Sequence, residues 1–221
     1  MIDTAPTYDA WAQTYDIFNS SNKNGDIVSV EERFLLPVLS AIIPGRAADF
    51  ACGTGRWATT LSGMGWDIAI TDQSRNMLSI AREKLKYFPP FLVQQCDLES
   101  SPSDLRGLDL AICSFALCHC KNITSAVQNM AISLRPGGLL VLSDVHPCIQ
   151  SKWGGDNHIE IESVRYPMPG WHWSVETYRK AMFDSGVAEL AVIEHDAIID
   201  EERRLGVLMI VGQKSASAAV S

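Results

Sequence analysis

The chain has 221 residues, and 26 acidic against 18 basic side chains give it a formal net charge of −8. This length suits one domain with a well-buried core, and the lack of any block of Lys or Arg argues against nucleic acid as a substrate, because clustered cations drive binding to phosphates. No apolar run approaches the ~20 residues of a membrane span and the N-terminus has no signal-like leader, so we expect a cytoplasmic protein without membrane contact.

Aromatic side chains open the chain at a helical spacing. They occupy positions 8, 11, 15 and 18, which predicts a helix docked on the core. The polar stretch 19–25 is rich in turn-forming residues and is expected to act as a hinge. Ser29 and Glu32 have the spacing of a capping box, which predicts a second helix to about Ile43, with Pro37 kinking or restarting it.

A glycine-rich turn follows the first apolar strand. The run 47–50 contains one acid, Asp49, and leads through Ala51, Gly53 and Gly55 into a helix expected over 54–64. Glycines let a ligand approach the backbone, and ligands of open α/β sheets lie outside the carboxyl ends of the strands. The turn therefore predicts a nucleotide-like cofactor. With Ala58 in the third position it also fits the looser dinucleotide fingerprint, so a nicotinamide cofactor stays open at this point.

Acids also mark the ends of later strands. The strand Asp67–Asp72 ends in an acid about 20 residues beyond the turn, where a carboxylate accepts ribose hydroxyls. The strand Phe91–Gln95 is followed by Asp97, and further strands are expected over 108–117 and before Asp144. Helices capped by Ser74 and Asn122 separate them. Short strands alternating with amphipathic helices predict an α/β fold with a doubly wound, mostly parallel sheet.

The order of these motifs resembles class I S-adenosylmethionine (SAM)-dependent methyltransferases. Their first motif has the form acid-x-Gly-x-Gly-x-Gly, which Asp49, Ala51, Gly53 and Gly55 match, with Ala51 in place of the first glycine. The match covers roughly 49–144. It implies a Rossmann-like sheet of seven strands with an antiparallel last strand, SAM as the cofactor, and an N-terminal Tyr-Asp…Tyr-Asp segment that covers it.

The resemblance also implies which residues hold the cofactor. Asp72 would accept both ribose hydroxyls, Asp97 would meet the adenine amino group, and Leu98 would pack on the ring. The implied cofactor contacts are Asp49, Ala51, Gly53, Gly55, Asp72, Gln73, Asp97, Leu98, Ser114 and Tyr15.

Beyond Asp144 the chain changes character. The stretch 146–173 is aromatic and long for a connection, so it is expected to be a substrate lid in which 159–166 forms one exposed strand. A helix capped by Ser174 and two strands, 189–198 and 205–213, complete the sheet. The predicted organisation is one domain: a helical lid (1–45), a cofactor-binding core (46–145), the substrate lid (146–173), a C-terminal unit (174–213) and a tail (214–221).

Six cysteines fall mostly within or beside expected strands, as small buried hydrophobes do, and predict no disulfide framework. Cys118-His119-Cys120 suggests a metal site, but structural zinc uses spaced cysteine pairs, and strand alternation would point the two thiols away from His119. No metal site is predicted.

Methyl transfer is an in-line displacement in which the protein holds donor and nucleophile close together. Acceptors of high pKa, such as phenols near ~10, gain from a base. The predicted catalytic residues are His146, His172 and His119; His158 is a further base candidate and His195 is assigned a structural role. The predicted acceptor-binding residues are Trp153, Arg165, Tyr166 and Trp173, with Trp171 as a further wall and Lys152 as a further cation.

The sequence therefore predicts a SAM-dependent methyltransferase of a small molecule, acting on oxygen in secondary or cofactor metabolism, as a monomer or homodimer. Small-molecule N-methylation is the neighbouring alternative. A SAM-binding regulatory or partner subunit without turnover, and a nicotinamide oxidoreductase, are the alternatives from other classes.

Overall fold

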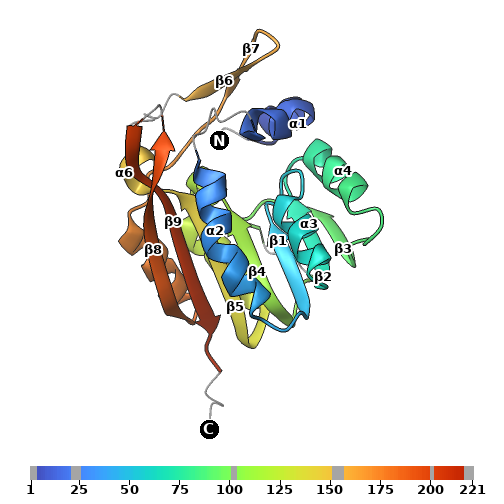
Figure 1. The fold of residues 1–221 in the computed structure, drawn as a ribbon, viewed down its shortest axis with the longest axis vertical. Coiled ribbons are helices and arrows are strands. Elements are labelled where there is room, and N and C mark those ends of the chain that lie inside the picture. Colours follow the sequence, from blue (N-terminus) through green and yellow to red (C-terminus); the bar gives the residue numbers. More distant parts are fainter. Residues whose placement is uncertain (1–3, 21–25, 101–103, 151–156, 200–201, 217–221) are drawn as a thin grey trace.

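The computed structural model describes residues 4–20, 26–100, 104–150, 157–199 and 202–216. Helices cover both faces of a central sheet (Figure 1). The sheet consists of β1 (Arg46–Phe50), β2 (Asp67–Asp72), β3 (Leu92–Gln95), β4 (Leu108–Ser114), β5 (Leu134–Val145), β8 (Val187–Ile199) and β9 (Glu202–Lys214). The other elements are α1 (Ala5–Ser20), α2 (Ile27–Ser40), α3 (Arg56–Gly63), α4 (Arg75–Lys84), η1 (Leu117–His119), α5 (Ile123–Ser133), α6 (Pro147–Gln150), β6 (His158–Ile161), β7 (Val164–Pro167) and α7 (Val175–Asp184).

The seven strands lie in the order β3-β2-β1-β4-β5-β9-β8. The pairs within β3-β2-β1-β4-β5 are all parallel, whereas β9 runs antiparallel to both β5 and β8. The predicted seven-stranded, doubly wound sheet with an antiparallel last strand is confirmed. Because the first five strands run the same way, their carboxyl ends meet at one edge, and polar residues that follow them are brought together.

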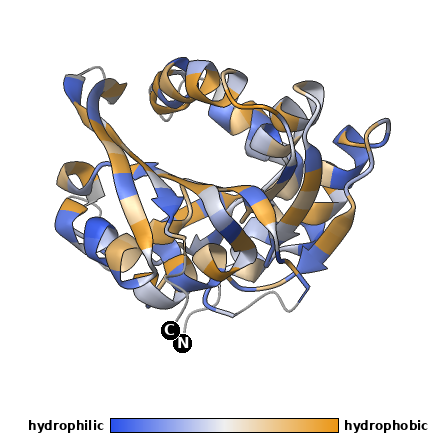
Figure 2. Cartoon of the chain, turned by 90° about the horizontal axis from the view of Figure 1, so that it is seen from below, coloured by the Kyte–Doolittle hydropathy of each residue, from blue (hydrophilic) through white to orange (hydrophobic). Residues whose placement is uncertain are grey.

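Alternation along the strands divides the core into two apolar layers. Ala47, Ile68 and Ile70 pack with α2, α3 and α4 on one face. Ala48 and Phe50 pack with α5 and α7 on the other. In Figure 2 the central strands carry much of the orange, apolar colour. Strands buried on both faces need apolar side chains at successive positions, which explains the near-continuous apolar runs of the sequence.

Local capping signals are confirmed where the side chain directly precedes its helix. The hydroxyls of Ser74 and Ser174 accept the backbone N–H three residues on, and the Asn122 amide oxygen accepts that of Ser125. The predicted capping box at Ser29 is wrong. α2 begins at Ile27, so Ser29 lies inside its first turn and donates to the Asp26 carbonyl oxygen at 2.8 Å; the helix continues through Pro37.

The segment 159–166, predicted as one strand, is a hairpin. β6 and β7 pair antiparallel, with Ile159 opposite Tyr166. The turn is made by Glu162 and Ser163, whose φ angles are 51° and 65°. Such left-handed turns usually use Asn or Gly, so this sequence gives no turn signal, and alternation alone does not reveal where a strand folds back.

Some predictions fall outside the described residues: most of the hinge 19–25, Lys152, Trp153 and the end of the tail. The division into lid, core and C-terminal unit stays a prediction. Within the described part of the chain, no helix combines the length and apolar character needed to cross a bilayer.

We expect Gly212→Ala to destabilise the hairpin of β8 and β9. A Cβ at Gly212 would lie 2.7 Å from Val187 Cγ1 and 2.9 Å from the Ala188 carbonyl oxygen, and overpacking of this kind costs about 1–3 kcal/mol. Gly63→Ala is the control, because a Cβ there meets no protein atom within 4 Å at an exposed helix end. Urea unfolding measures both variants; equal stability of the two would contradict the packing account.

Candidate active site

A cleft of about 530 Å³ lies where the parallel strands end. Its walls come from α1, from the turns after β1 to β4, from η1 and from the segment before α7. Among the sequence-predicted site residues, it is lined by Tyr15, Ala51, Gly53, Asp72, Gln73, Asp97, Leu98, Ser114 and His119. Lining residues that the sequence analysis did not assign to the site include Thr4, Ala5, Tyr8, Gln95, Cys96, Glu99, Phe115, Ala116, Cys120 and Lys121.

In the turn after β1, every second residue from Ala51 to Gly55 has a left-handed backbone conformation. The φ angles of Ala51, Gly53 and Gly55 are 52°, 54° and 84°. A Cβ at Gly53 would meet no protein atom within 4 Å, so its bare backbone faces the cleft, whereas a Cβ at Gly55 would lie 3.0 Å from Ala81 Cβ. Gly53 therefore serves ligand approach and Gly55 serves packing of α3 on α4. Ala51 holds the same left-handed conformation at a cost of about 1–2 kcal/mol.

Asp49 does not line the cleft but contacts the helix that follows this turn. It is buried at the end of β1, and its Oδ2 accepts the Ala58 backbone N–H at 2.8 Å. Burial raises the pKa of Asp49 to about 7, although the hydrogen bond from Ala58 opposes the rise. The carboxylate therefore fixes the first turn of α3 relative to β1.

Asp72 lies at the end of β2 and lines the cleft. Its Oδ2 accepts the Gly53 N–H and its Oδ1 accepts the Ser74 N–H, both at 2.8 Å. Burial raises its pKa to about 6, with the two backbone hydrogen bonds acting against the rise. A carboxylate has about four acceptor positions, so the ionised side chain can accept a ligand hydroxyl while it ties two turns together.

The turn after β3 forms the next part of the wall. Asp97 and Leu98 line the cleft as predicted, and Asp97 Oδ1 accepts the Glu99 N–H at 2.9 Å. Glu99 in turn accepts the Lys121 N–H at 2.6 Å. This end of the cleft is acidic, with a cation at its side, and suits the polar edge of a base and a ribose.

Helix α1 is anchored across the cofactor side of the cleft. Asp9 accepts the Ser74 hydroxyl proton and the Asn76 N–H. Asp16 accepts hydrogen bonds from Thr54 Oγ1 and Lys84 Nζ, both at 2.6 Å. In Figure 1, α1 stands above the edge of the sheet, beside α4. The predicted role of this segment as a cofactor lid stays a prediction.

Tyr8, Tyr15, Phe115 and Trp171 line the cleft together with His119, and this part of the wall is called the aromatic end. The Nδ1 of His119 lies 2.8 Å from the Pro169 carbonyl oxygen, and its Nε2 lies 3.0 Å from the Tyr8 hydroxyl. A carbonyl oxygen only accepts, so Nδ1 carries the proton and Nε2 accepts from Tyr8. Burial, followed by neighbouring acidic groups, raises the pKa of Tyr8 well above 10.

The other predicted catalytic residues do not reach this cleft. His146 is buried at the end of β5, where its Nε2 lies 2.8 Å from Glu194 Oε2 and its Nδ1 accepts the Cys148 N–H at 3.2 Å. His172 is exposed. Both nitrogens of His146 are therefore engaged away from the cleft, and the structure brings only His119 to it.

The predicted acceptor residues that the structure describes, Arg165, Tyr166 and Trp173, do not line the cleft. Arg165 pairs with His158 Nδ1 at 2.8 Å in the hairpin, which also contains Tyr166. Trp173 donates from its indole N–H to the Cys120 carbonyl oxygen at 3.1 Å and packs against the core beside α5 and α7. Trp171 is the tryptophan that lines the cleft.

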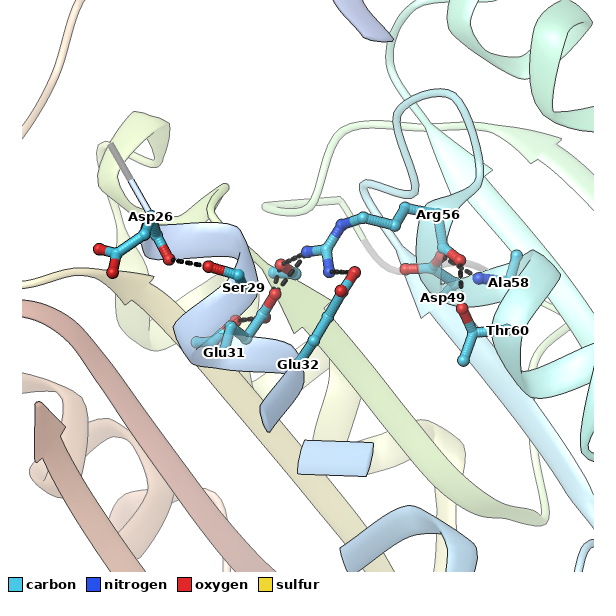
Figure 3. Close-up of polar contacts among 10 residues, drawn as sticks. Asp26, Ser29, Glu31, Glu32, Asp49, Arg56, Ala58 and Thr60 are labelled. Carbon is cyan, nitrogen blue, oxygen red and sulfur yellow. Dashed lines mark hydrogen bonds and ion pairs between the residues drawn. The ribbon is translucent and has the colours of Figure 1, made fainter. Parts of the chain in front are cut away.

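A partly buried ion-pair network between α2 and α3 was not predicted (Figure 3). Glu31 of α2 is fully buried and pairs with Arg56 Nη2, while Arg56 Nη1 reaches Glu32 at 3.1 Å. The Ser114 hydroxyl donates to Glu31 at 2.7 Å and accepts from Arg56 at 2.9 Å. The network therefore fixes the end of β4 beside Phe115, whose φ of 52° is strained for an aromatic residue.

Sequence comparisons connect the chain with methyltransferases. A family model described as a methyltransferase domain matches residues 47–138. The chain is 25% identical over 141 residues to the demethylmenaquinone methyltransferase of Staphylococcus haemolyticus, covering 58% of this chain and 59% of that protein. It is 26% identical over 144 residues to the ubiquinone/menaquinone biosynthesis C-methyltransferase UbiE of Nitrosospira multiformis, covering 63% and 59%. The matched stretch is thus less than two thirds of either relative.

Solved structures share the fold over more of the chain. The DhpI–S-adenosylhomocysteine complex has a TM-score of 0.71 at 18% identity, covering 96% of this chain and 95% of that one. The N-methyltransferase NodS from Bradyrhizobium japonicum, in complex with S-adenosylhomocysteine (SAH), has a TM-score of 0.69 at 15% identity, covering 89% and 91%. At these identities the likeness establishes the fold.

We expect Asp49→Asn to stabilise the protein most at alkaline pH. Because the pKa of Asp49 is raised from 3.8 to about 7 in the folded state, its ionised form opposes folding above pH ~4, and most above pH 7. An Asn oxygen still accepts from Ala58, so the expected gain is about 1–3 kcal/mol at pH 8, falling toward zero near pH 4.

Urea unfolding at pH 8, 6 and 4 measures this gain, with Asp67→Asn at the exposed start of β2 as the control. An equal gain of Asp49→Asn at pH 4 and pH 8, or a loss at pH 8, would contradict the assigned burial cost.

Proposed function

Because residues 47–138 belong to the methyltransferase-domain family and the chain has the class I SAM-dependent methyltransferase fold, we propose that it transfers the methyl group of SAM to an oxygen atom of a small-molecule acceptor. The observation that carries this proposal is one cleft with acids at its cofactor side and a histidine at its aromatic end. The acids match the ribose and adenine contacts expected of strands β2 and β3.

The chain's own residues fit the cofactor. Asp72 would accept the ribose hydroxyls, Asp97 would accept from the adenine amino group, and Leu98 would pack on the ring. Gly53 leaves its backbone open at the point of closest approach. When bound, SAM supplies a methyl group on a positively charged sulfur, and the three acidic lining residues Asp72, Asp97 and Glu99 favour a cationic ligand.

The acceptor would lie at the aromatic end, where His119 has the right position for a base. Its Nε2 lies 3.0 Å from the Tyr8 hydroxyl and its Nδ1–H donates to the Pro169 carbonyl oxygen, which fixes the tautomer whose Nε2 can take a proton. Holding acceptor and cofactor in line contributes up to ~7–11 kcal/mol, and a positioned base adds a further ~10²–10⁴-fold. Removal of a hydroxyl proton at this position supports methylation of oxygen.

Carbon is the second candidate for the methylated atom. The two curated relatives are named for methyl transfer to demethylmenaquinone and for C-methylation in quinone biosynthesis. A hydroxyl group that loses its proton to His119 also raises the electron density at neighbouring ring carbons, so the same base supports either outcome.

The direct test is an assay with methyl-labelled SAM and a panel of phenols, alcohols, carboxylic acids and amines, with products identified by mass spectrometry. We expect methyl transfer to oxygen in at least one class, and a ~10²–10⁴-fold lower kcat for His119→Gln, with SAH affinity unchanged in calorimetry. His172→Gln is the control, because that exposed histidine lies outside the cleft.

Labelled carbon rather than labelled oxygen would assign the second candidate. Binding of SAH without turnover on any acceptor would instead favour a regulatory or partner subunit. Binding of a nicotinamide cofactor in place of SAH in thermal-shift competition would overturn the proposal.

A further inference from the structure

We propose that Tyr8 relays the acceptor's proton to His119, and that the acceptor is an uncharged planar aromatic compound carrying a hydroxyl group on its ring. This inference rests on the proposed function of the same cleft and names its substrate class. It makes Tyr8, on the N-terminal helix, a catalytic residue. Three features support it: the direction of the two hydrogen bonds of His119, the aromatic residues that line the cleft, and the contacts that hold Tyr8 in place.

The basic nitrogen of His119 is already covered. Since Nδ1–H donates to Pro169, the lone pair of Nε2 accepts the Tyr8 O–H at 3.0 Å. A hydroxyl group entering the cleft therefore meets the Tyr8 oxygen in front of His119. That oxygen donates its one proton to Nε2 and still has lone pairs for an incoming O–H. The arrangement favours a chain from the acceptor hydroxyl through Tyr8 to His119.

The proton balance of this chain is complete. The acceptor O–H bond breaks and its proton passes to the Tyr8 oxygen, while the proton that Tyr8 carried passes to His119 Nε2. The acceptor oxygen forms a bond to the methyl carbon as the carbon–sulfur bond breaks, and that electron pair stays on sulfur. Tyr8 ends neutral, as burial requires of a phenol whose pKa is raised well above 10. His119 ends as an imidazolium that returns its proton to solvent.

The walls of this end select an aromatic ring. Tyr8, Tyr15, Phe115 and Trp171 all line it, and flat side chains of this kind stack favourably on a planar ligand. Phe115 lines the cleft despite a left-handed φ of 52°, and strain in a bulky residue marks positions held for function. Four aromatic walls around one histidine suit a ring whose hydroxyl points at Tyr8.

The charges of the lining disfavour an anionic acceptor. Asp72, Asp97 and Glu99 line the cleft and would repel a carboxylate or phosphate. Among the described lining residues the cation is Lys121, so the three acidic side chains outnumber it. A carboxylate needs an Arg or Lys partner to offset its desolvation, whereas a neutral hydroxyl group needs one acceptor, which Tyr8 provides.

The relay is held in place by contacts between segments far apart in the chain. Thr7 Oγ1 donates to the Pro167 carbonyl oxygen at 2.8 Å, directly beside Tyr8. The Trp171 backbone N–H donates to the Cys118 carbonyl oxygen at 2.7 Å, directly beside His119. Helix α1, η1 and the segment before α7 are thus tied together around the two reacting side chains, so their geometry exists before any acceptor binds.

The test uses SAH-loaded protein and three probes of one shape: 2-naphthol, its methyl ether and 2-naphthoate. Calorimetry should give 2-naphthol at least ~5-fold higher affinity than the methyl ether, because a donated hydrogen bond is worth about 1 kcal/mol, and 2-naphthoate the lowest affinity. Tyr8→Phe should remove the preference for naphthol over its ether. Tyr87→Phe, at an exposed tyrosine far from the cleft, should keep it.

The other possible results test the relay, the substrate class and the proposed function separately. A Tyr8→Phe protein that keeps the naphthol preference would overturn the relay, and tighter binding of naphthoate than of naphthol would overturn the substrate class. His119→Gln gives a second variant: it should keep the naphthol preference, since Tyr8 still accepts, and loss of the preference there alone would also contradict the relay. Failure to bind SAH at all would instead refute the proposed function.

Discussion

Buried carboxylates at the ends of parallel strands hold this cleft together. Asp49, Asp72 and Asp144 each lie at or near the end of an apolar strand, and each accepts at least one backbone N–H from a neighbouring turn or helix. Asp72 joins the β1 and β2 turns, and Asp144 joins β5 to the start of η1 through Cys118. Burial raises the pKa of all three carboxyl groups, so their ionisation at neutral pH lowers the stability of the fold. In return, hydrogen-bond acceptors stand at the edge of the sheet where a ligand binds.

Which parts of this arrangement the sequence predicts depends on how far apart in the chain the interacting residues lie. Apolar runs followed by acids, and Ser or Asn before a helix, are local signals, so the sheet, the caps and Asp72 and Asp97 follow from them. The contact between Tyr8 and His119 joins residues 111 positions apart, and no local pattern reveals it. His146 is the opposite case: the sheet rule predicts a place near the cleft, whereas its Nε2 lies 2.8 Å from Glu194 Oε2 and it is not among the lining residues.

The proposed cofactor site and the proposed acceptor site draw on different parts of the chain. The glycine turn, Asp49, Asp72 and Asp97 belong to the part that matches the methyltransferase-domain family, residues 47–138. Tyr8 and Trp171 lie outside that span, on the helix and the segment that close the aromatic end. Because a shared fold supports many reactions, we expect these added segments, together with His119 and Phe115, to select the acceptor. The ion pair of the buried Glu31 with the partly exposed Arg56 links the two parts, since it fixes Ser114 and hence the strained Phe115.

The central claim is that the strand-end acids form a cofactor site, and calorimetric titration of SAH into Asp72→Ala tests it most directly. We expect at least ~10-fold weaker binding than in the wild-type protein, because hydrogen bonds to a charged group contribute about 1.5–3 kcal/mol. Asp67→Ala, at the exposed opposite end of the same strand, should bind SAH as the wild type does. An unchanged Kd for Asp72→Ala, or the same loss for Asp67→Ala, would contradict the account.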